Sequence, residues 1–146
     1  MKITGSVLLV IAAIAVLCIA LLHIAIIFLG RKAYGYFGAA QLIPLVEKGS
    51  PWPTVITFLL AGVFAVCGLY GLSGAGVLPH LPLLRIGLMA VSAVFTLRGL
   101  ALIKEIPKAL RMAGAVPQRE LVFSSVSLVT GLLFLSGLIL RWHDLA

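Results

Sequence analysis

Four long runs of apolar residues, separated by polar or glycine-rich segments, dominate the chain. The runs cover residues 5–29, 52–72, 83–103 and 121–140. A helix needs about 20 apolar residues to cross the hydrocarbon core of a bilayer, and each run reaches that length. We therefore predict an all-α membrane protein with a single transmembrane domain over residues 1–146. Its four spans are expected to form an antiparallel bundle.

The segment between the first two runs, residues 30–52, is too polar for a span and too apolar for a free loop. Arg31 and Lys32 end the first run, residues 39–43 are apolar again, and Pro44 limits the helix that they can form. We predict a short interfacial or re-entrant helix in this first loop. A loop lying on the membrane surface is the alternative under the same interfacial physics.

The composition agrees with a polytopic membrane protein. The chain is 62% hydrophobic and 10% charged, with a mean hydropathy of +1.23, which lies outside the range of soluble globular proteins. The formal net charge is +7, and most basic residues flank the apolar runs. Anionic lipid headgroups are therefore the expected counter-charge, rather than nucleic acid. The predicted interfacial anchors are Arg31, Lys32, Tyr34, Trp52, Arg85 and Trp142.

The basic residues also predict an orientation. The first and third loops contain Arg31, Lys32, Lys48, Lys104, Lys108, Arg111 and Arg119, whereas the opposite side has Lys2, Arg85 and Arg141. The positive-inside rule then places the two richer loops in the cytoplasm. Because the number of spans is even, both termini are predicted to be periplasmic.

Arg98 lies inside the third run, near its C-terminal end. An arginine on an isolated membrane helix costs from about 2.5 to more than 10 kcal/mol, so it requires water, a partner or a nearby interface. The predicted topology places it in the cytoplasmic third with inward polar residues of the other runs. The candidate ligand-binding residues are Arg98, His23, Thr57, Ser124 and Ser127.

Two interpretations of these residues remain open. In the first, they form a polar pocket in which the planar guanidinium of Arg98 binds a carboxylate or phosphate in a bidentate manner. In the second, Arg98 snorkels to the headgroups while the Ser and Thr hydroxyls bond carbonyls of their own helices. His23 is then an ordinary packing residue between helices.

The sequence offers little support for catalysis. No Asp or Glu lies within a run, and we find neither a paired acid and base nor a nucleotide-binding loop. Cys18 and Cys67 both fall inside apolar runs without a C-x-x-C pattern, which favours packing over metal binding or a disulfide. We therefore assign no catalytic residue, metal or cofactor.

Two function classes remain. The first is a non-enzymatic membrane protein that binds or translocates a lipid or an amphipathic anion through the cytoplasmic-side pocket. Because a four-helix unit is small for a transporter, this class implies a homo-oligomer. The second is an interaction protein, either an accessory subunit of a membrane complex or an immunity protein against a pore-forming toxin. Residues at helical spacing share a face in three of the runs: Ala13, Val16, Ala20, His23 and Ile27 in the first, Gly87, Val91, Val94, Arg98 and Leu102 in the third, and Ser124, Ser127 and Gly131 in the fourth. The small residues on these faces allow close helix packing in lipid and support the second class.

Several short segments carry a resemblance to a family. They are Ala33-Tyr34, Phe37-Gly38-Ala39, Tyr70-Gly71-Leu72-Ser73-Gly74-Ala75-Gly76, Leu81-Pro82-Leu83-Leu84-Arg85 and Leu97-Arg98-Gly99-Leu100. Their pattern resembles small bacterial inner-membrane proteins that have four spans and no assigned function. The resemblance implies location in the bacterial inner membrane and a common four-helix design, and it implies no activity.

Overall fold

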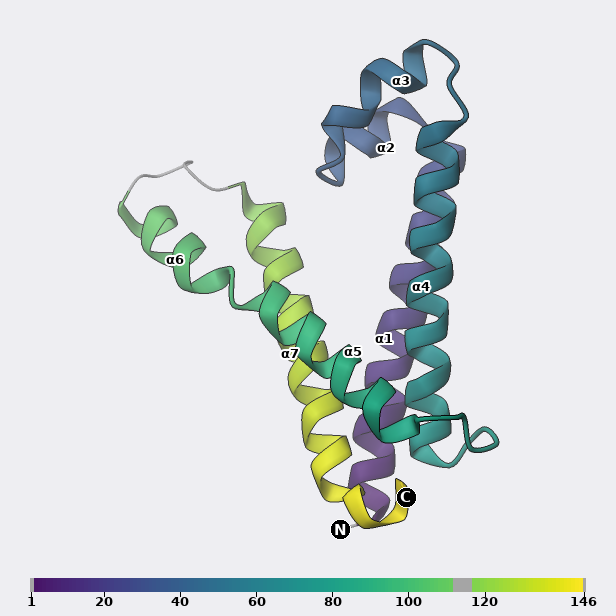
Figure 1. The fold of residues 1–146 in the computed structure, drawn as a ribbon. Coiled ribbons are helices and arrows are strands. Elements are labelled where there is room, and N and C mark those ends of the chain that lie inside the picture. The colour runs from purple at the N-terminus through teal and green to yellow at the C-terminus, as the bar shows by residue number, and fades with distance from the viewer. Residues whose placement is uncertain (1, 112–116, 146) are drawn as a thin grey trace. The chain divides into compact units, whose positions relative to one another are not determined.

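Helices are the only regular secondary structure in the described part of the chain. The structure is a computed structural model that describes residues 2–111 and 117–145, and these residues contain no strand. The elements in chain order are α1 (Lys2–Leu29), α2 (Arg31–Tyr36), η1 (Ala40–Leu42), α3 (Ile43–Glu47), α4 (Trp52–Ala75), α5 (Leu84–Gly99), α6 (Leu102–Arg111), α7 (Gln118–Leu140) and η2 (Trp142–Leu145) (Figure 1).

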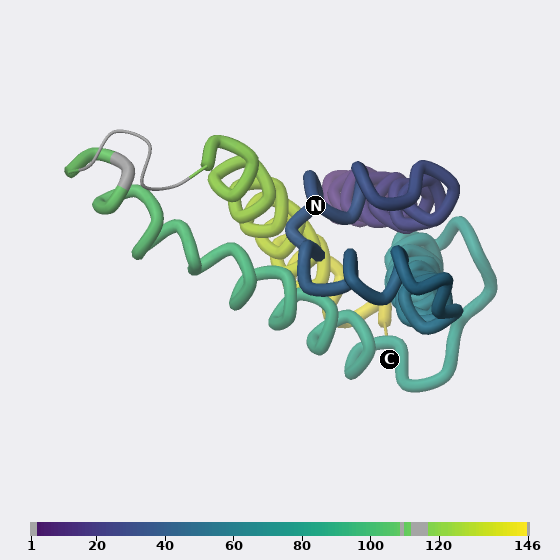
Figure 2. Tube along the Cα trace, turned by 90° about the horizontal axis from the view of Figure 1, so that it is seen from above, coloured from purple at the N-terminus to yellow at the C-terminus, as the bar shows by residue number. Residues whose placement is uncertain are grey.

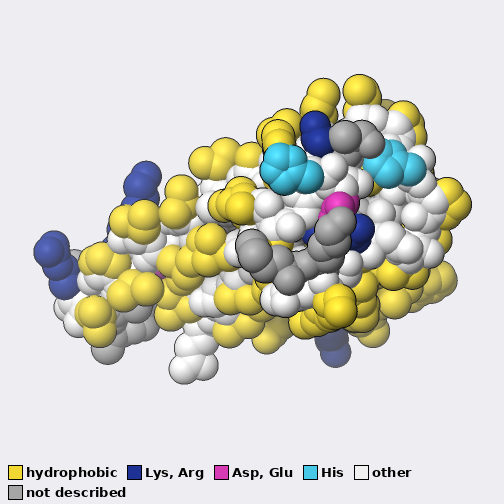
Figure 3. Space-filling view, turned by 90° about the horizontal axis from the view of Figure 1, so that it is seen from below, with side chains coloured by type: hydrophobic (Ala, Val, Ile, Leu, Met, Phe, Trp, Pro, Cys, Tyr) yellow, Lys and Arg dark blue, Asp and Glu magenta, His cyan; other side chains and the backbone are white. Residues whose placement is uncertain are grey.

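Four stretches are long and apolar enough to cross a membrane. They are Ile3–Leu29, Trp52–Ala75, Leu84–Lys108 and Gln118–Leu140. The prediction of an all-α protein with four such helices is confirmed, and it indicates a multi-pass membrane protein. Large hydrophobic side chains along these stretches are exposed, among them Phe28 at 85% and Leu59 at 63%, as sides in contact with lipid permit. Figure 3 shows the molecule from below, where hydrophobic side chains lie among Lys, Arg and His. The antiparallel four-helix bundle remains a prediction.

The chain divides into two compact units. The larger unit contains Met1–Ala15 and Cys67–Ala146, and the smaller unit contains Val16–Val66. Helices α1 and α4 each contribute one part to both units.

In the larger unit, α5 and α7 lie side by side (Figures 1 and 2). Gly99 of α5 packs directly on the backbone of Leu128. A Cβ atom on Gly131 of α7 would lie 2.5 Å from the backbone nitrogen of Thr96. The partner residues on α7 rise in number as those on α5 fall, so the two helices are antiparallel. Glycines at these points allow the close backbone approach that stabilises helix pairs in lipid.

The start of α1 also packs on the end of α7 in the larger unit. Leu9 is fully buried, and a Cβ atom added to Gly137 would meet its side chain. Gly5 similarly lies against Leu140 and Arg141. The first turns of α1 and the last turns of α7 therefore lie at the same end of this unit, as an even number of spans requires.

Two helix ends differ from the sequence prediction. Helix α4 continues to Ala75 instead of ending at residue 72, because Gly76, with φ of 81°, supplies the left-handed residue that ends it. The Val77 amide donates to the Leu72 carbonyl at 3.0 Å, as in a Schellman motif. Helix α5 ends at Gly99 instead of continuing to residue 103. A turn at residues 100–101 then leads into α6.

The first loop, in the smaller unit, contains three short helical pieces instead of one helix. Gly38 and Gly49 have φ of 85° and 68°, and these left-handed residues follow α2 and α3. Ile26, Ala33 and Tyr34 form the buried core of the loop. Its interfacial or re-entrant position in a membrane remains a prediction.

We expect Gly131→Ala to destabilise the α5–α7 pair, because the new methyl group collides with the backbone of Thr96. Overpacking of this kind costs about 1–3 kcal/mol. Gly62→Ala is the matched control, because a Cβ atom there meets nothing within 4 Å. Thermal unfolding in detergent should give a lower Tm for Gly131→Ala alone. Equal melting of the two variants would contradict the close contact.

Candidate functional site

The side chain of Arg98, one residue before the end of α5, is joined to two other helices through one hydroxyl group. Its Nη1 atom donates to the Oγ atom of Ser124 on α7 at 2.8 Å. The same hydroxyl donates to Oε1 of Glu105 on α6 at 3.0 Å. Ser124 is 0% exposed. A buried hydroxyl that both accepts and donates is satisfied, and here it connects α5, α6 and α7.

Two further charged residues of α7 lie near this relay. Oε2 of Glu120 is 3.9 Å from Nη2 of Arg98, and Nε of Arg119 is 4.0 Å from Oε1 of Glu120. With Glu105, the group contains two positive and two negative side chains. Because the side chain of Arg98 is 46% exposed, its long contact with Glu120 contributes no more than about 1 kcal/mol.

Helix α6 presents two distinct exposed faces. At 100° per residue, its apolar side chains occupy a sector of about 100° and its cations a separate sector of about 60°. Ile103 and Leu110 are 68% and 82% exposed. We call the exposed cations the basic face, consisting of Lys104, Lys108 and Arg111. Glu105 lies outside both sectors, and its bond to Ser124 turns it toward α7.

The predicted pocket residues of the smaller unit have local partners. His23 donates from Nδ1 to the carbonyl oxygen of Ile19 in its own helix at 2.7 Å, and its ring lies 4.9 Å from that of Phe64. Thr57 donates to the carbonyl oxygen of Pro53 at 2.7 Å. These contacts correspond to the packing interpretation of His23 and Thr57.

Of the five predicted residues, Arg98 and Ser124 are brought into contact. Ser127 lies one turn beyond Ser124 on α7 and is partly buried. Glu105 and Glu120 were not predicted to belong to this site, because they were treated as residues of loops and helix ends. The sequence does contain one signal for Glu105, which is its position outside both the apolar and the cationic sector on a helical projection of residues 102–111.

The predicted anchors have different environments. Tyr34 is 2% exposed, and its hydroxyl lies 3.1 Å from Oγ1 of Thr57. This hydrogen bond connects the first loop to α4. Arg31 pairs with Glu47 at 3.1 Å, while Lys32 and Trp52 are exposed. The guanidinium of Arg85 lies 5.0 Å from the ring centroid of Trp142, a cation–π contact.

Arg141 has a structural role at the C-terminal end of α7, away from the relay at Ser124. Its Nη1 atom donates to the carbonyl oxygen of Gly74, near the end of α4, at 2.6 Å. Nε lies 3.9 Å from Oδ2 of Asp144, and the Arg141 side chain is only 16% exposed. A cation at a helix C-terminus satisfies free carbonyls and interacts favourably with the helix dipole.

Comparison of the chain with protein-family models, curated proteins and solved structures finds no match. The function is therefore inferred from the geometry of the described residues.

We expect Ser124→Ala to lower the free energy of unfolding by about 1–3 kcal/mol, because it leaves Arg98 and Glu105 without their shared partner. Ser125→Ala is the control. Ser125 is exposed and donates to the Leu121 carbonyl of its own helix, so the loss of its hydroxyl should cost less than about 0.5 kcal/mol. Chemical unfolding in mixed micelles measures both. Similar values for the two variants would refute the relay as a connection between helices.

Removal of the Arg141 side chain tests whether its hydrogen bond to the Gly74 carbonyl stabilises the larger unit. Arg141→Ala should destabilise the protein by about 1.5–3 kcal/mol, the usual contribution of a hydrogen bond to a charged group. Arg31→Ala removes an arginine whose side chain is 68% exposed, and it should change stability by less than about 1 kcal/mol. Melting curves of the two variants at equal detergent concentration provide the comparison.

Proposed function

We propose that this protein is a non-enzymatic integral membrane protein that binds anionic lipid, with α6 as the element that contacts headgroups. The observation that carries the proposal is the pair of separate, exposed faces on α6, one apolar and one basic. A short helix of this type lies in the membrane interface, where its apolar side chains enter the acyl region and its cations meet phosphate groups.

The Arg98–Ser124–Glu105 relay supports this role by fixing the rotation of α6. Glu105 is bonded to α7, so α6 cannot turn about its axis without breaking that bond. Lys104, Lys108 and Arg111 are then exposed on a side of α6 separate from its apolar side chains. Each lysine or arginine near an anionic surface contributes about 1 kcal/mol.

Arg98 has a positioning role in this proposal. Glu105 and Glu120 offset the charges of Arg98 and Arg119, so a phosphate placed at Arg98 would also meet nearby carboxylates. The three cations of the basic face have an excess positive charge, and they are the stronger anion-binding element. The proposed site therefore retains Arg98 and Ser124 as supports for α6.

The proposed setting is the inner membrane of a bacterium, with α6 on the cytoplasmic side. The excess of Lys and Arg in the first and third loops supports this orientation. Anionic lipids give the cytoplasmic leaflet a negative surface potential that attracts basic segments next to a span.

The test compares the wild type with the triple variant Lys104→Gln, Lys108→Gln, Arg111→Gln. Phosphatidylglycerol should raise the Tm of the wild type more than phosphatidylcholine does. The triple variant should lose most of this difference, because removing three cations costs about 3 kcal/mol, or on the order of 100-fold in affinity. The variant Lys104→Arg, Lys108→Arg preserves the charge and should behave as the wild type.

An equal response of the wild type and the triple variant would refute the proposal. A pull-down from native membranes distinguishes the second candidate, an accessory subunit or an immunity protein. A stoichiometric foreign polypeptide that is lost from the triple variant, with unchanged lipid binding, would assign the basic face to a protein partner.

A further inference from the structure

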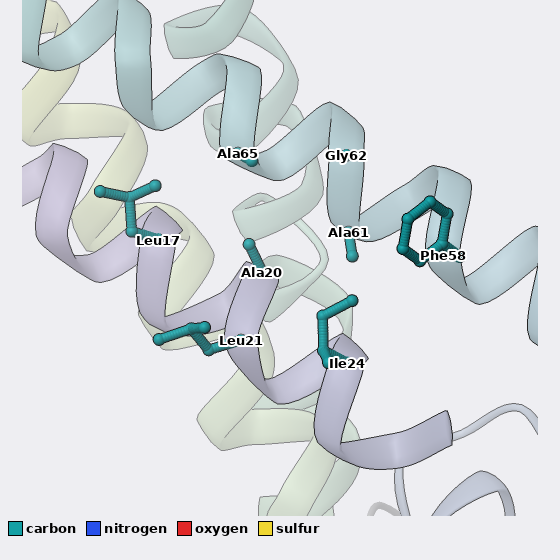
Figure 4. A pocket seen from close by; sticks show the side chains of 8 residues that line it. All are labelled: Leu17, Ala20, Leu21, Ile24, Phe58, Ala61, Gly62 and Ala65. Atoms are coloured by element: carbon teal, nitrogen blue, oxygen red, sulfur yellow. The ribbon is translucent and has the colours of Figure 1, made fainter. Parts of the chain in front are cut away.

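An apolar groove runs between α1 and α4 within the smaller unit (Figure 4). Its volume is about 430 Å³. Gly62 lies on its wall, and a Cβ atom there would meet nothing within 4 Å, so the groove is open at this point. All eight lining residues are apolar: Leu17, Ala20, Leu21, Ile24, Phe58, Ala61, Gly62 and Ala65.

The length and the lining of the groove suit a hydrocarbon chain. Leu17 and Ile24 are seven residues apart on α1, so the groove is about 10 Å long. A groove of this length, with apolar side chains along it, can accept part of the acyl chain of a lipid.

Positive charge lies beyond one end of the groove. Helix α1 continues from Ile24 to Leu29, a rise of about 8 Å, and then reaches Arg31 and Lys32. Arg31 is paired with Glu47, while Lys32 and Lys48 are exposed in the same loop. An acyl chain in the groove would thus bring its headgroup to the level of a loop with excess positive charge, which favours an anionic phosphate.

We propose that this groove is a site for one acyl chain of an anionic phospholipid, whose headgroup phosphate is bound by Lys32. This inference rests on the proposed function, lipid binding, and it assigns a second site in other residues. The occupant is an anionic lipid because every lining side chain is apolar and the adjacent loop is positively charged.

Filling the groove provides the first test. Gly62→Leu places a side chain in open space, so the variant should fold and melt as the wild type does. We expect the filled variant to retain one phosphatidylglycerol fewer than the wild type, counted by native mass spectrometry, because the α6 site is unchanged. Val63→Leu is the matched control, since Val63 is exposed and lies outside the groove lining. Ala65→Leu is a second filling variant that keeps the test valid if Gly62→Leu does not fold.

The headgroup contact is tested separately. Lys32→Gln should weaken the binding of phosphatidylglycerol about fivefold, as expected for one cation, while leaving phosphatidylcholine unaffected. The free headgroup, glycerol phosphate, should not compete with phosphatidylglycerol for this site, because the acyl chain supplies most of the binding. Effective competition by glycerol phosphate would overturn the acyl-chain assignment.

The outcomes separate this site from α6. Lipid retention by Gly62→Leu and Ala65→Leu, with loss in the triple variant of α6, would refute the groove and leave the proposed function standing. Loss in the filling variants with no effect of the triple variant would refute α6 and support the groove. A change in oligomer mass for the filling variants would show that a second copy occupies the groove, which also overturns the inference.

Discussion

The close backbone contact between α5 and α7 is the constraint on which the larger unit depends. In lipid, the surroundings of a helix are as apolar as its own side chains, so association relies on packing and on internal hydrogen bonds. Gly99 and Gly131 permit that packing. Because Arg98 precedes Gly99 directly, the same contact brings its guanidinium within 2.8 Å of the Ser124 hydroxyl. The orientation of α6 therefore follows from a glycine contact.

Much of this architecture could be predicted from the sequence because it depends on the hydrophobicity of each run and on the helical repeat of 3.6 residues per turn. Runs of apolar residues identified the four long helices, and small residues on α7 indicated a packing face. Ser124 and Gly131 are indeed buried on that face. The face predicted on α1 is buried at Ala13, Val16 and Ala20, while its last two positions, His23 and Ile27, are partly buried. These predictions succeed because a helix has a fixed rotation per residue, so spacing alone identifies the residues that share a face.

Contacts made after a change of chain direction could not be predicted in the same way. The break at residues 100–101 allows Glu105 to reach Ser124, and the turn after α7 directs Arg141 to the Gly74 carbonyl. Tyrosine is a residue type that favours the headgroup region, yet the folding of the first loop buries Tyr34 beside Thr57. The face expected to contain Arg98 also included Val94, which is 63% exposed. Such features depend on tertiary direction, which a helical period does not encode.

The length of α5 has a consequence for the surrounding bilayer. Its 16 residues rise about 24 Å, so a hydrocarbon core of roughly 30 Å is crossed only with residues of α6, which the candidate span Leu84–Lys108 includes. Hydrophobic mismatch of this sign is relieved by local thinning of the bilayer or by drawing flanking residues inward. Here the flanking residues include the first turn of α6. In the proposed orientation, the depth of α6 therefore depends on the thickness of the surrounding bilayer.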